Sequence, residues 1–170
     1  MNNDKFILDA TAGFRMMWFN KHHPNTIYLD ERPECEPDIV GDFRDLKQFE
    51  DGTFRLIVFD PPHIIQDNVY GGSEIIHKYG ALRAETWQSE LQKGFIELWR
   101  VLANYGMLLF KWSNTHISSA EILKLAPVKP LFYQVAKVGK LKSCGDYKLK
   151  TLWFCFMKIP KSKTFADKGD

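Results

Sequence analysis

The sequence has few of the features that mark secreted, membrane-spanning or metal-binding proteins. It holds 3 cysteines in 170 residues, an odd number at wide spacing, which argues against a disulfide framework and a cysteine-rich zinc site. No apolar run is long enough to cross a bilayer, and the polar start, MNNDK, is unlike a secretory signal. His22 and His23 are adjacent and cannot share a helix face as paired metal ligands do. We therefore expect a cytoplasmic protein with reduced thiols and no metal site.

Two phosphate-binding motifs are also missing. The chain contains neither GxGxxG nor GxxxxGK[ST], and the small-residue turn that follows its first predicted strand has a single glycine, Gly13. A dinucleotide site needs several glycines that let the backbone come close to the pyrophosphate. A P-loop needs the glycines and the lysine of its motif to bind phosphates. Dinucleotide-dependent enzymes and P-loop ATPases or kinases are thus disfavoured.

What the chain does have is ample material for one packed core. With 45% hydrophobic and 14% aromatic residues in 170, we expect a single domain over residues 1–160 and a polar tail over residues 161–170. Charge is unevenly spread: residues 1–60 hold seven Lys/Arg and twelve Asp/Glu, whereas residues 111–170 hold twelve and four. A basic second half fits either a nucleic-acid partner or a surface tuned for solubility.

Strand and helix patterns alternate along the chain. The longest helix pattern, residues 86–103, repeats apolar side chains at helical spacing. Residues 64–83 predict a long loop, residues 43–49 a helical turn, and residues 139–150 a hairpin connection. The other predicted helices are residues 14–23 and 117–125, and the predicted strands are residues 6–12, 26–29, 39–42, 54–59, 107–111, 131–138 and 152–159. This order predicts an α/β fold around one mostly parallel sheet.

Four aspartates stand at or near the ends of successive predicted strands: Asp9, Asp30, Asp42 and Asp60. The carboxyl ends of parallel strands share one edge, where ligands bind in open α/β sheets. Each acid alone is explained by a turn or helix cap. Four together on one rim repel one another, which favours a ligand-binding rim.

The spacing of two of these acids suggests a nucleoside. Asp30 lies 21 residues after Asp9, where an acid accepts hydrogen bonds from ribose hydroxyls. A nucleoside without phosphate fits the missing motifs best. S-adenosylmethionine has a ribose for Asp30, an adenine amine for Asp42, and cationic groups that tolerate an acidic rim.

The sharpest signal is Asp60-Pro61-Pro62-His63, directly after the apolar run of residues 54–59. The exocyclic amine of a heteroaromatic base is a poor nucleophile because its lone pair is delocalised. Hydrogen-bond acceptors held in place can draw that nitrogen toward tetrahedral geometry. Asp60 supplies a carboxylate oxygen, the Pro61 carbonyl a second acceptor, and the two prolines keep both fixed.

With these motifs, the chain resembles the class I S-adenosylmethionine-dependent methyltransferases, and more narrowly the Asp/Asn-Pro-Pro-Tyr/Phe/Trp amino-methyltransferases of DNA and RNA, in a compact, phage-like form. The resemblance covers nearly the whole chain. It implies a Rossmann-like, seven-stranded, mostly parallel sheet with an antiparallel last strand and helices on both faces. It also implies four groups of site residues: Asp9, Ala10, Thr11, Ala12 and Gly13 for the methionine part, Asp30 with Glu31 for the ribose, Asp42 and Phe43 for the adenine, and Asp60, Pro61, Pro62 and His63 for the target amine.

The departures from that family leave the substrate open. His63 replaces the usual aromatic residue and can stack or hydrogen-bond, and no separate target-recognition domain fits in 170 residues. Substrate contacts are expected from Tyr70, Lys111, Lys140 and Lys142. DNA is preferred to RNA as the partner, with a homodimer or recognition partner also considered. A protein or small-molecule substrate, or a non-catalytic subunit on the same fold, are the alternatives.

Overall fold

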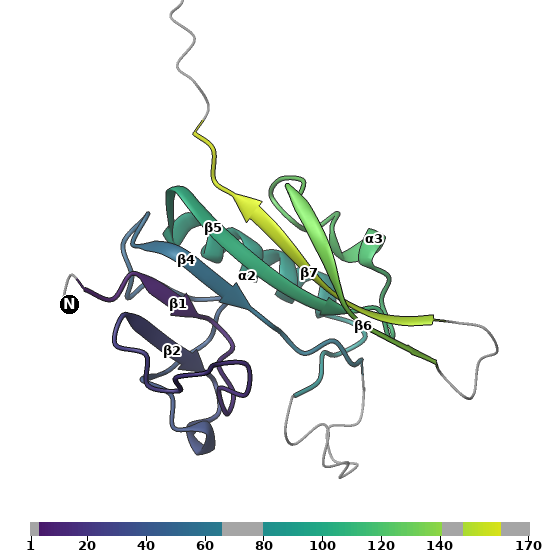
Figure 1. Ribbon diagram of the computed structural model, residues 1–170, viewed down its shortest axis with the longest axis horizontal. Coiled ribbons are helices and arrows are strands. Elements are labelled where there is room, and N and C mark those ends of the chain that lie inside the picture. Colours follow the sequence, from purple (N-terminus) through teal and green to yellow (C-terminus); the bar gives the residue numbers. More distant parts are fainter. Residues whose placement is uncertain (1–3, 66–79, 141–147, 161–170) are drawn as a thin grey trace, which may run out of the picture.

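The computed structural model describes residues 4–65, 80–140 and 148–160. Its centre is a seven-stranded sheet in the order β3-β2-β1-β4-β5-β7-β6 (Figure 1). The strands are β1 (Ile7–Asp9), β2 (Thr26–Asp30), β3 (Ile39–Val40), β4 (Phe54–Phe59), β5 (Leu102–Ser113), β6 (Phe132–Lys140) and β7 (Lys148–Met157). The first five strands pair in parallel, and β7 runs antiparallel to both β5 and β6. The predicted α/β sheet with an antiparallel last strand is confirmed.

The strand order places a topological switch point between β1 and β4. From β1 the chain continues outward to β2 and β3, then returns to β4 on the other side of β1. The connections on the two sides diverge there, which leaves a crevice at the carboxyl ends of these strands. The fold therefore brings the ends of β1, β2 and β4 to one place.

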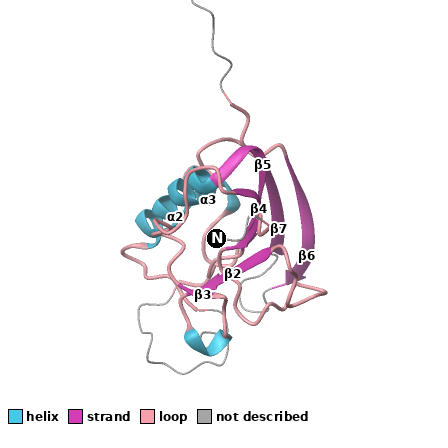
Figure 2. Ribbon diagram, turned by 90° about the vertical axis from the view of Figure 1, so that its left-hand side faces the viewer, coloured by secondary structure: helices cyan, strands magenta, loops and turns pink. Residues whose placement is uncertain are grey.

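Two α-helices are described, α2 (Trp87–Val101) and α3 (Ser119–Ile122), with a short 3-10 helix, η1 (Pro33–Cys35). Both α-helices lie on the same side of the sheet (Figure 2). The α-helices among the described residues thus cover one face of the sheet, and helices on both faces stay a prediction. A short connection such as that between β2 and β3 has no room for a long helix.

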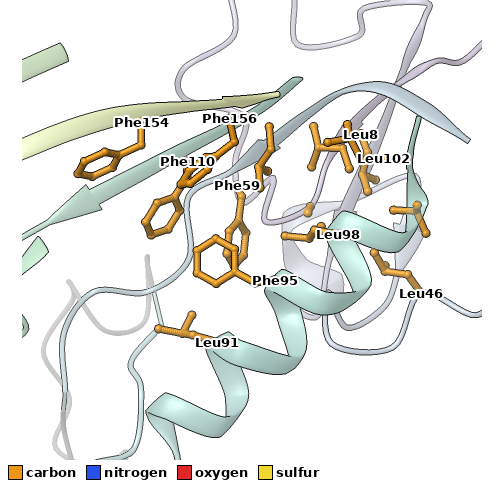
Figure 3. Close-up of a cluster of buried hydrophobic side chains, with 14 of the residues drawn as sticks. Leu8, Leu46, Phe59, Leu91, Phe95, Leu98, Leu102, Phe110, Phe154 and Phe156 are labelled. Atoms are coloured by element: carbon orange, nitrogen blue, oxygen red, sulfur yellow. The ribbon is translucent and has the colours of Figure 1, made fainter. Parts of the chain in front are cut away.

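The core lies between α2 and the sheet. The apolar face of α2 presents Leu91, Phe95 and Leu98, all fully buried, toward the strands (Figure 3). Phe95 packs edge-on against Phe59 and Phe110, with ring centroids 5.7 and 5.1 Å apart. These aromatic contacts fix β4 and β5 relative to the helix.

Residues 14–23 form successive turns instead of the predicted helix. Arg15 has a φ of 55°, in the left-handed region that a helix interior excludes. Its guanidinium donates to the carbonyl oxygen of Glu36 at 2.6 Å, and the Trp18 indole N–H donates to the Asp9 carboxylate at 2.6 Å. These tertiary contacts hold the segment against β1 and β2, and sequence periodicity gives no sign of them.

Several predicted boundaries also shift. β5 runs from Leu102 to Ser113, longer than predicted, whereas α3 keeps only Ser119–Ile122 behind a capping box of Ser118 and Glu121. Residues 43–49, predicted as a helical turn, form turns in the structure. No helix among the described residues is long and apolar enough to span a membrane.

Candidate functional site

A cleft that is partly open to solvent lies at the carboxyl ends of β1, β2 and β4. Its lining comes from segments far apart in the sequence, which the sheet order brings together. The lining residues are Ala10, Thr11, Gly13, Phe14, Met16, Asp30, Glu31, Arg32, Gly41, Phe43, Asp60, Pro62 and Gly80. The cleft is therefore where the sequence predicts a nucleoside site.

Most of the predicted site residues line this cleft. Those that do are Ala10, Thr11, Gly13, Asp30, Glu31, Phe43, Asp60 and Pro62. Those that do not are Asp9, Ala12, Asp42, Pro61 and His63, which lie behind the lining or beside it. The structure thus joins the turn after β1, the end of β2 and the end of β4 in one site.

Asp30 ends β2 and is 5% exposed. Its Oδ1 accepts from the Arg32 amide at 3.0 Å and from Arg32 Nε at 2.9 Å. Its Oδ2 accepts from the Gly13 amide at 2.7 Å and from Arg32 Nη2 at 3.1 Å. Burial acts to raise the pKa of this carboxyl, but the hydrogen bonds and charge of Arg32, with the Gly13 amide, lower it overall. Asp30 is therefore ionised, and its carboxylate links the turn at Gly13 to Arg32 by accepting hydrogen bonds from both residues.

Gly13 has a φ of 49°, which turns its amide toward Asp30. A side chain is disfavoured in this conformation, and a Cβ would also lie 3.3 Å from Arg32 Nη2. One glycine is enough for this turn, since the amide meets a carboxylate rather than a phosphate.

Asp9 is fully buried and supports the cleft from behind. Its carboxylate accepts from Trp18 Nε1 at 2.6 Å and from the Thr11 amide at 3.3 Å. Burial raises its pKa to about 7, against these hydrogen bonds, and the charges of Asp60 and Asp30 add to the rise. Asp9 holds the turn after β1 in shape instead of facing a ligand.

Asp60 lines the cleft and is held on two sides. Its amide donates to Thr11 Oγ1 at 2.9 Å, which ties the end of β4 to the turn after β1. Its Oδ2 lies 2.6 Å from Lys111 Nζ, and no described residue donates to its Oδ1. Because Phe59 pairs with Phe110 across β4 and β5, Lys111 stands directly beside Asp60.

Phe43 forms one wall of the cleft. Its ring packs against Phe59, with centroids 5.0 Å apart, and lies so close to α2 that a Cβ on Gly94 would overlap it. The neighbouring Asp42 is turned away from the lining and accepts from Arg44 Nε at 2.8 Å. Burial acts to raise the pKa of Asp42, but the hydrogen bonds and charge of Arg44 lower it overall.

His63 is half-buried and lies next to the Asp60–Lys111 pair. Its ring meets Trp112 edge-on, at 6.3 Å between centroids and 75° between planes. Burial lowers its pKa; the charge of Asp60 opposes this, and Lys111 and His116 add to it. The imidazole is therefore neutral near pH 7 and keeps its hydrogen-bonding nitrogens.

The sequence reasoning missed the cations that accompany these acids. Arg32 and Arg44 each follow an aspartate by two residues, in Asp30-Glu31-Arg32 and Asp42-Phe43-Arg44, and this repeated Asp-x-Arg pattern was a readable signal. The lining residues Phe14, Met16, Gly41 and Gly80 carried no such signal. Since each arginine pairs with its aspartate, the acids on the rim do not by themselves require a cationic ligand.

Of the predicted substrate residues, Lys111 contacts the site through its ion pair with Asp60. Tyr70 and Lys142 lie outside the described residues. Lys140 is the last residue of β6. The contribution of those three stays a prediction.

Comparison with known proteins identifies solved structures that have a similar fold. No protein-family model matches the sequence, and no curated protein matches it either. Among solved structures, an S-adenosylmethionine-dependent methyltransferase from Methanosarcina mazei superposes with a TM-score of 0.52 at 11% identity, covering 95% of each chain. The chain has the methyltransferase fold. A geranyl diphosphate methyltransferase in complex with S-adenosylmethionine gives 0.54 at 12% identity, over 94% of this chain and 80% of that one.

A third similar structure is the 1,6-didemethyltoxoflavin-N1-methyltransferase of Burkholderia thailandensis, with bound 1,6-didemethyltoxoflavin and S-adenosylhomocysteine. It gives a TM-score of 0.52 at 11% identity, over 91% of this chain and 71% of that chain. At such identities the likeness extends to the fold alone, so the chemistry must come from the site residues.

Proposed function

We propose that this chain is an S-adenosylmethionine-dependent methyltransferase that acts on an exocyclic amine of a nucleic-acid base, with adenine N6 or cytosine N4 of DNA as the favoured targets. One observation carries the proposal: Asp60, before the two prolines, lines the same cleft as Gly13, Asp30 and Phe43. An acceptor for an amine and the elements of a nucleoside site are thus within one cavity.

The residues present fit the cofactor. Asp30 is an ionised acceptor at the end of β2, where a ribose is bound in related folds, and Phe43 offers an apolar wall for an adenine ring. Gly13 lets the backbone approach without a side chain. When bound there, S-adenosylmethionine would supply an electrophilic methyl group on its sulfonium.

Asp60 is the residue that would orient the target amine. Lys111 donates to Oδ2 of Asp60, and the Asp60 amide donates to the Thr11 hydroxyl. These contacts fix the side-chain conformation of Asp60 and leave Oδ1 to accept a hydrogen bond from the amine. This is preorganisation of the acceptor, which costs no rearrangement at the moment of reaction. The amine loses a proton after the methyl group has moved, and the neutral His63 stands next to this position.

A base in a duplex would have to leave the stack to reach Asp60. The proposed substrate contacts remain Lys111, Lys140, Lys142 and Tyr70. A second copy of the chain or a recognition partner would select the target sequence. The predicted location is the cytoplasm, where nucleic acid is accessible.

A second candidate is methylation of a small molecule, a protein side chain or RNA on the same scaffold. The cleft lining carries three carboxylates, Asp30, Glu31 and Asp60, against one guanidinium, Arg32. Such a lining suits a small uncharged or cationic acceptor as well as a nucleobase.

The deciding experiment is transfer of tritiated methyl groups from S-adenosylmethionine to total DNA and total RNA, followed by nucleoside analysis. Label in N6-methyladenine or N4-methylcytosine of DNA supports the proposal. Asp60→Ala should bind S-adenosylhomocysteine as the wild type does and lose methyl transfer, whereas Asp45→Ala, at an exposed carboxylate, should keep both. Unchanged transfer in Asp60→Ala would remove Asp60 from the mechanism.

A non-catalytic subunit is the remaining alternative, and a thermal shift tests it. One-site binding stabilises the native state by RT ln(1 + [L]/Kd). A clear rise in Tm with S-adenosylmethionine supports an enzyme, and no rise at millimolar concentration supports a subunit that has lost the cofactor.

A further inference from the structure

The carboxylate of Asp30 has no acceptor position left. An ionised carboxylate offers about four lone-pair sites, two on each oxygen. Oδ1 accepts from the Arg32 amide and Arg32 Nε, and Oδ2 accepts from the Gly13 amide and Arg32 Nη2, all between 2.7 and 3.1 Å. A ribose needs an acceptor for each of two hydroxyls, so a further partner must displace one already present.

The four donors differ in how easily they can leave. The amides of Gly13 and Arg32 belong to the backbone of the turn after β1 and of the end of β2, and their removal would deform the fold. The guanidinium ends a long side chain that is 21% exposed and lines the cleft. It is the donor group among these that belongs to a side chain, so it can leave Asp30 by a rotamer change without moving the backbone.

Removing the guanidinium would vacate one position on each oxygen, the one held by Nε on Oδ1 and the one held by Nη2 on Oδ2. Two adjacent acceptors on one carboxylate match the two hydroxyls of a vicinal diol. The side chain of Arg32 therefore stands where a ribose would bind.

We propose that Arg32 is an affinity-setting residue of this site: its guanidinium occupies the sugar position on Asp30, and nucleoside binding exchanges it for the two ribose hydroxyls. The proposal rests on the proposed function, because it takes a nucleoside-containing cofactor as the ligand. It further implies that the cofactor binds less tightly than it would to the same site without the Arg32 guanidinium, because that group must first leave Asp30.

Arg32→Met tests this exchange, because methionine keeps the length of the side chain and the backbone amide but removes both side-chain donors. The control is Arg55→Met, which makes the same change at an exposed arginine of β4 that does not line the cleft. Isothermal titration with S-adenosylhomocysteine, adenosine and 2′,3′-dideoxyadenosine measures the Kd values. Thermal melts of the ligand-free proteins measure stability separately.

For Arg32→Met we expect S-adenosylhomocysteine and adenosine to bind about tenfold more tightly, equivalent to roughly 1.4 kcal/mol, with a lower Tm for the ligand-free protein. The gain should vanish for 2′,3′-dideoxyadenosine, which has no hydroxyls to exchange. Arg55→Met should leave all three Kd values unchanged.

Three results would count against the exchange. Equal or weaker binding of S-adenosylhomocysteine by Arg32→Met would make Arg32 a ligand or a structural residue. An equal gain in affinity for adenosine and 2′,3′-dideoxyadenosine would mean that the substitution acts by removing a charge or by opening the cleft, and not through the ribose hydroxyls. If neither the wild type nor Arg32→Met binds any of the three compounds, the proposed function itself fails. If the wild type binds them and Arg32→Met binds no more tightly, only the exchange is contradicted.

Discussion

Lys111 and Asp60 form an ion pair between neighbouring strands at the edge of the cleft, with Nζ 2.6 Å from Oδ2. Asp60 extends β4 and Lys111 lies in β5, and the pairing of Phe59 with Phe110 sets them side by side. The ammonium also lies 5.9 Å from the centroid of the Trp153 ring. The carboxylate that defines the candidate active site is thus fixed by a residue 51 positions later in the chain.

Lys111→Met should lower the methyl-transfer rate by about 10²-fold and leave the Kd of S-adenosylhomocysteine nearly unchanged, because Asp60 loses its anchor while the nucleoside site is intact. Lys111→Arg should restore most of the rate, since a guanidinium can hold the same oxygen. Single-turnover methylation and titration calorimetry separate the two effects. The control is Lys124→Met, at an exposed position two residues after the end of α3. A loss of cofactor affinity equal to the loss of rate would instead make Lys111 a cofactor ligand.

Gly94→Ala should weaken binding of S-adenosylhomocysteine by about tenfold. A Cβ at this position overlaps the ring of Phe43, which must move toward the cleft that it lines. Gln92→Ala, on the exposed face of α2, should have no effect. The double variant Gly94→Ala/Phe43→Leu should recover the stability lost by Gly94→Ala alone, and continued destabilisation in the double variant would place the clash elsewhere.

Asp9→Asn should change how stability depends on pH. The pKa of Asp9 rises from 3.8 to about 7 on folding, so the native state binds a proton that the unfolded state releases across this range. The free energy of unfolding of the wild type, relative to that of Asp9→Asn, should therefore fall as pH rises from about 4 to 7, by at most roughly 1.4 kcal/mol per pH unit. Above pH 7 the difference should be constant.

Urea denaturation of both proteins between pH 4 and 8 measures this difference. Contributions from Asp42 and His63 cancel, because both proteins contain these groups and neither acts on Asp9. A constant difference across the whole range would mean that Asp9 is ionised in the native state throughout.

Arg100→Met should destabilise the fold by about 2 kcal/mol. Arg100 donates to the carbonyl oxygens of Leu46 and Phe49, at 3.0 Å each, and to the carboxylates of Glu97 and Asp51, which joins α2 to the turns before β4. Lost bonds to backbone acceptors cost more than an exposed ion pair does. Lys47→Met, which removes the exposed pair with Asp45, should cost less than about 0.5 kcal/mol. Similar losses for the two variants in urea denaturation would contradict this view of Arg100.

The sequence alone determined the alternation of strands and helices and the positions of the acids after β2 and β4. Apolar runs that end in aspartate or proline report local backbone preferences, and these survive in the structure. The same reasoning predicted a helix over residues 14–23, from an aromatic-rich stretch that ends before Pro24. In the structure, Arg15 and Trp18 instead form hydrogen bonds to Glu36 and Asp9. Local patterns carry no information about such distant hydrogen bonds.

Only the tertiary structure decided which side chains meet. Asp9 and Asp30 look alike in sequence, each at a strand end, yet Asp9 is enclosed behind the cleft and Asp30 lines it. The neighbours of a carboxylate depend on strand order and register, which arise from packing of the whole sheet. The partnership of Asp60 with Lys111 is of this kind, because only the pairing of β4 with β5 brings the two residues together.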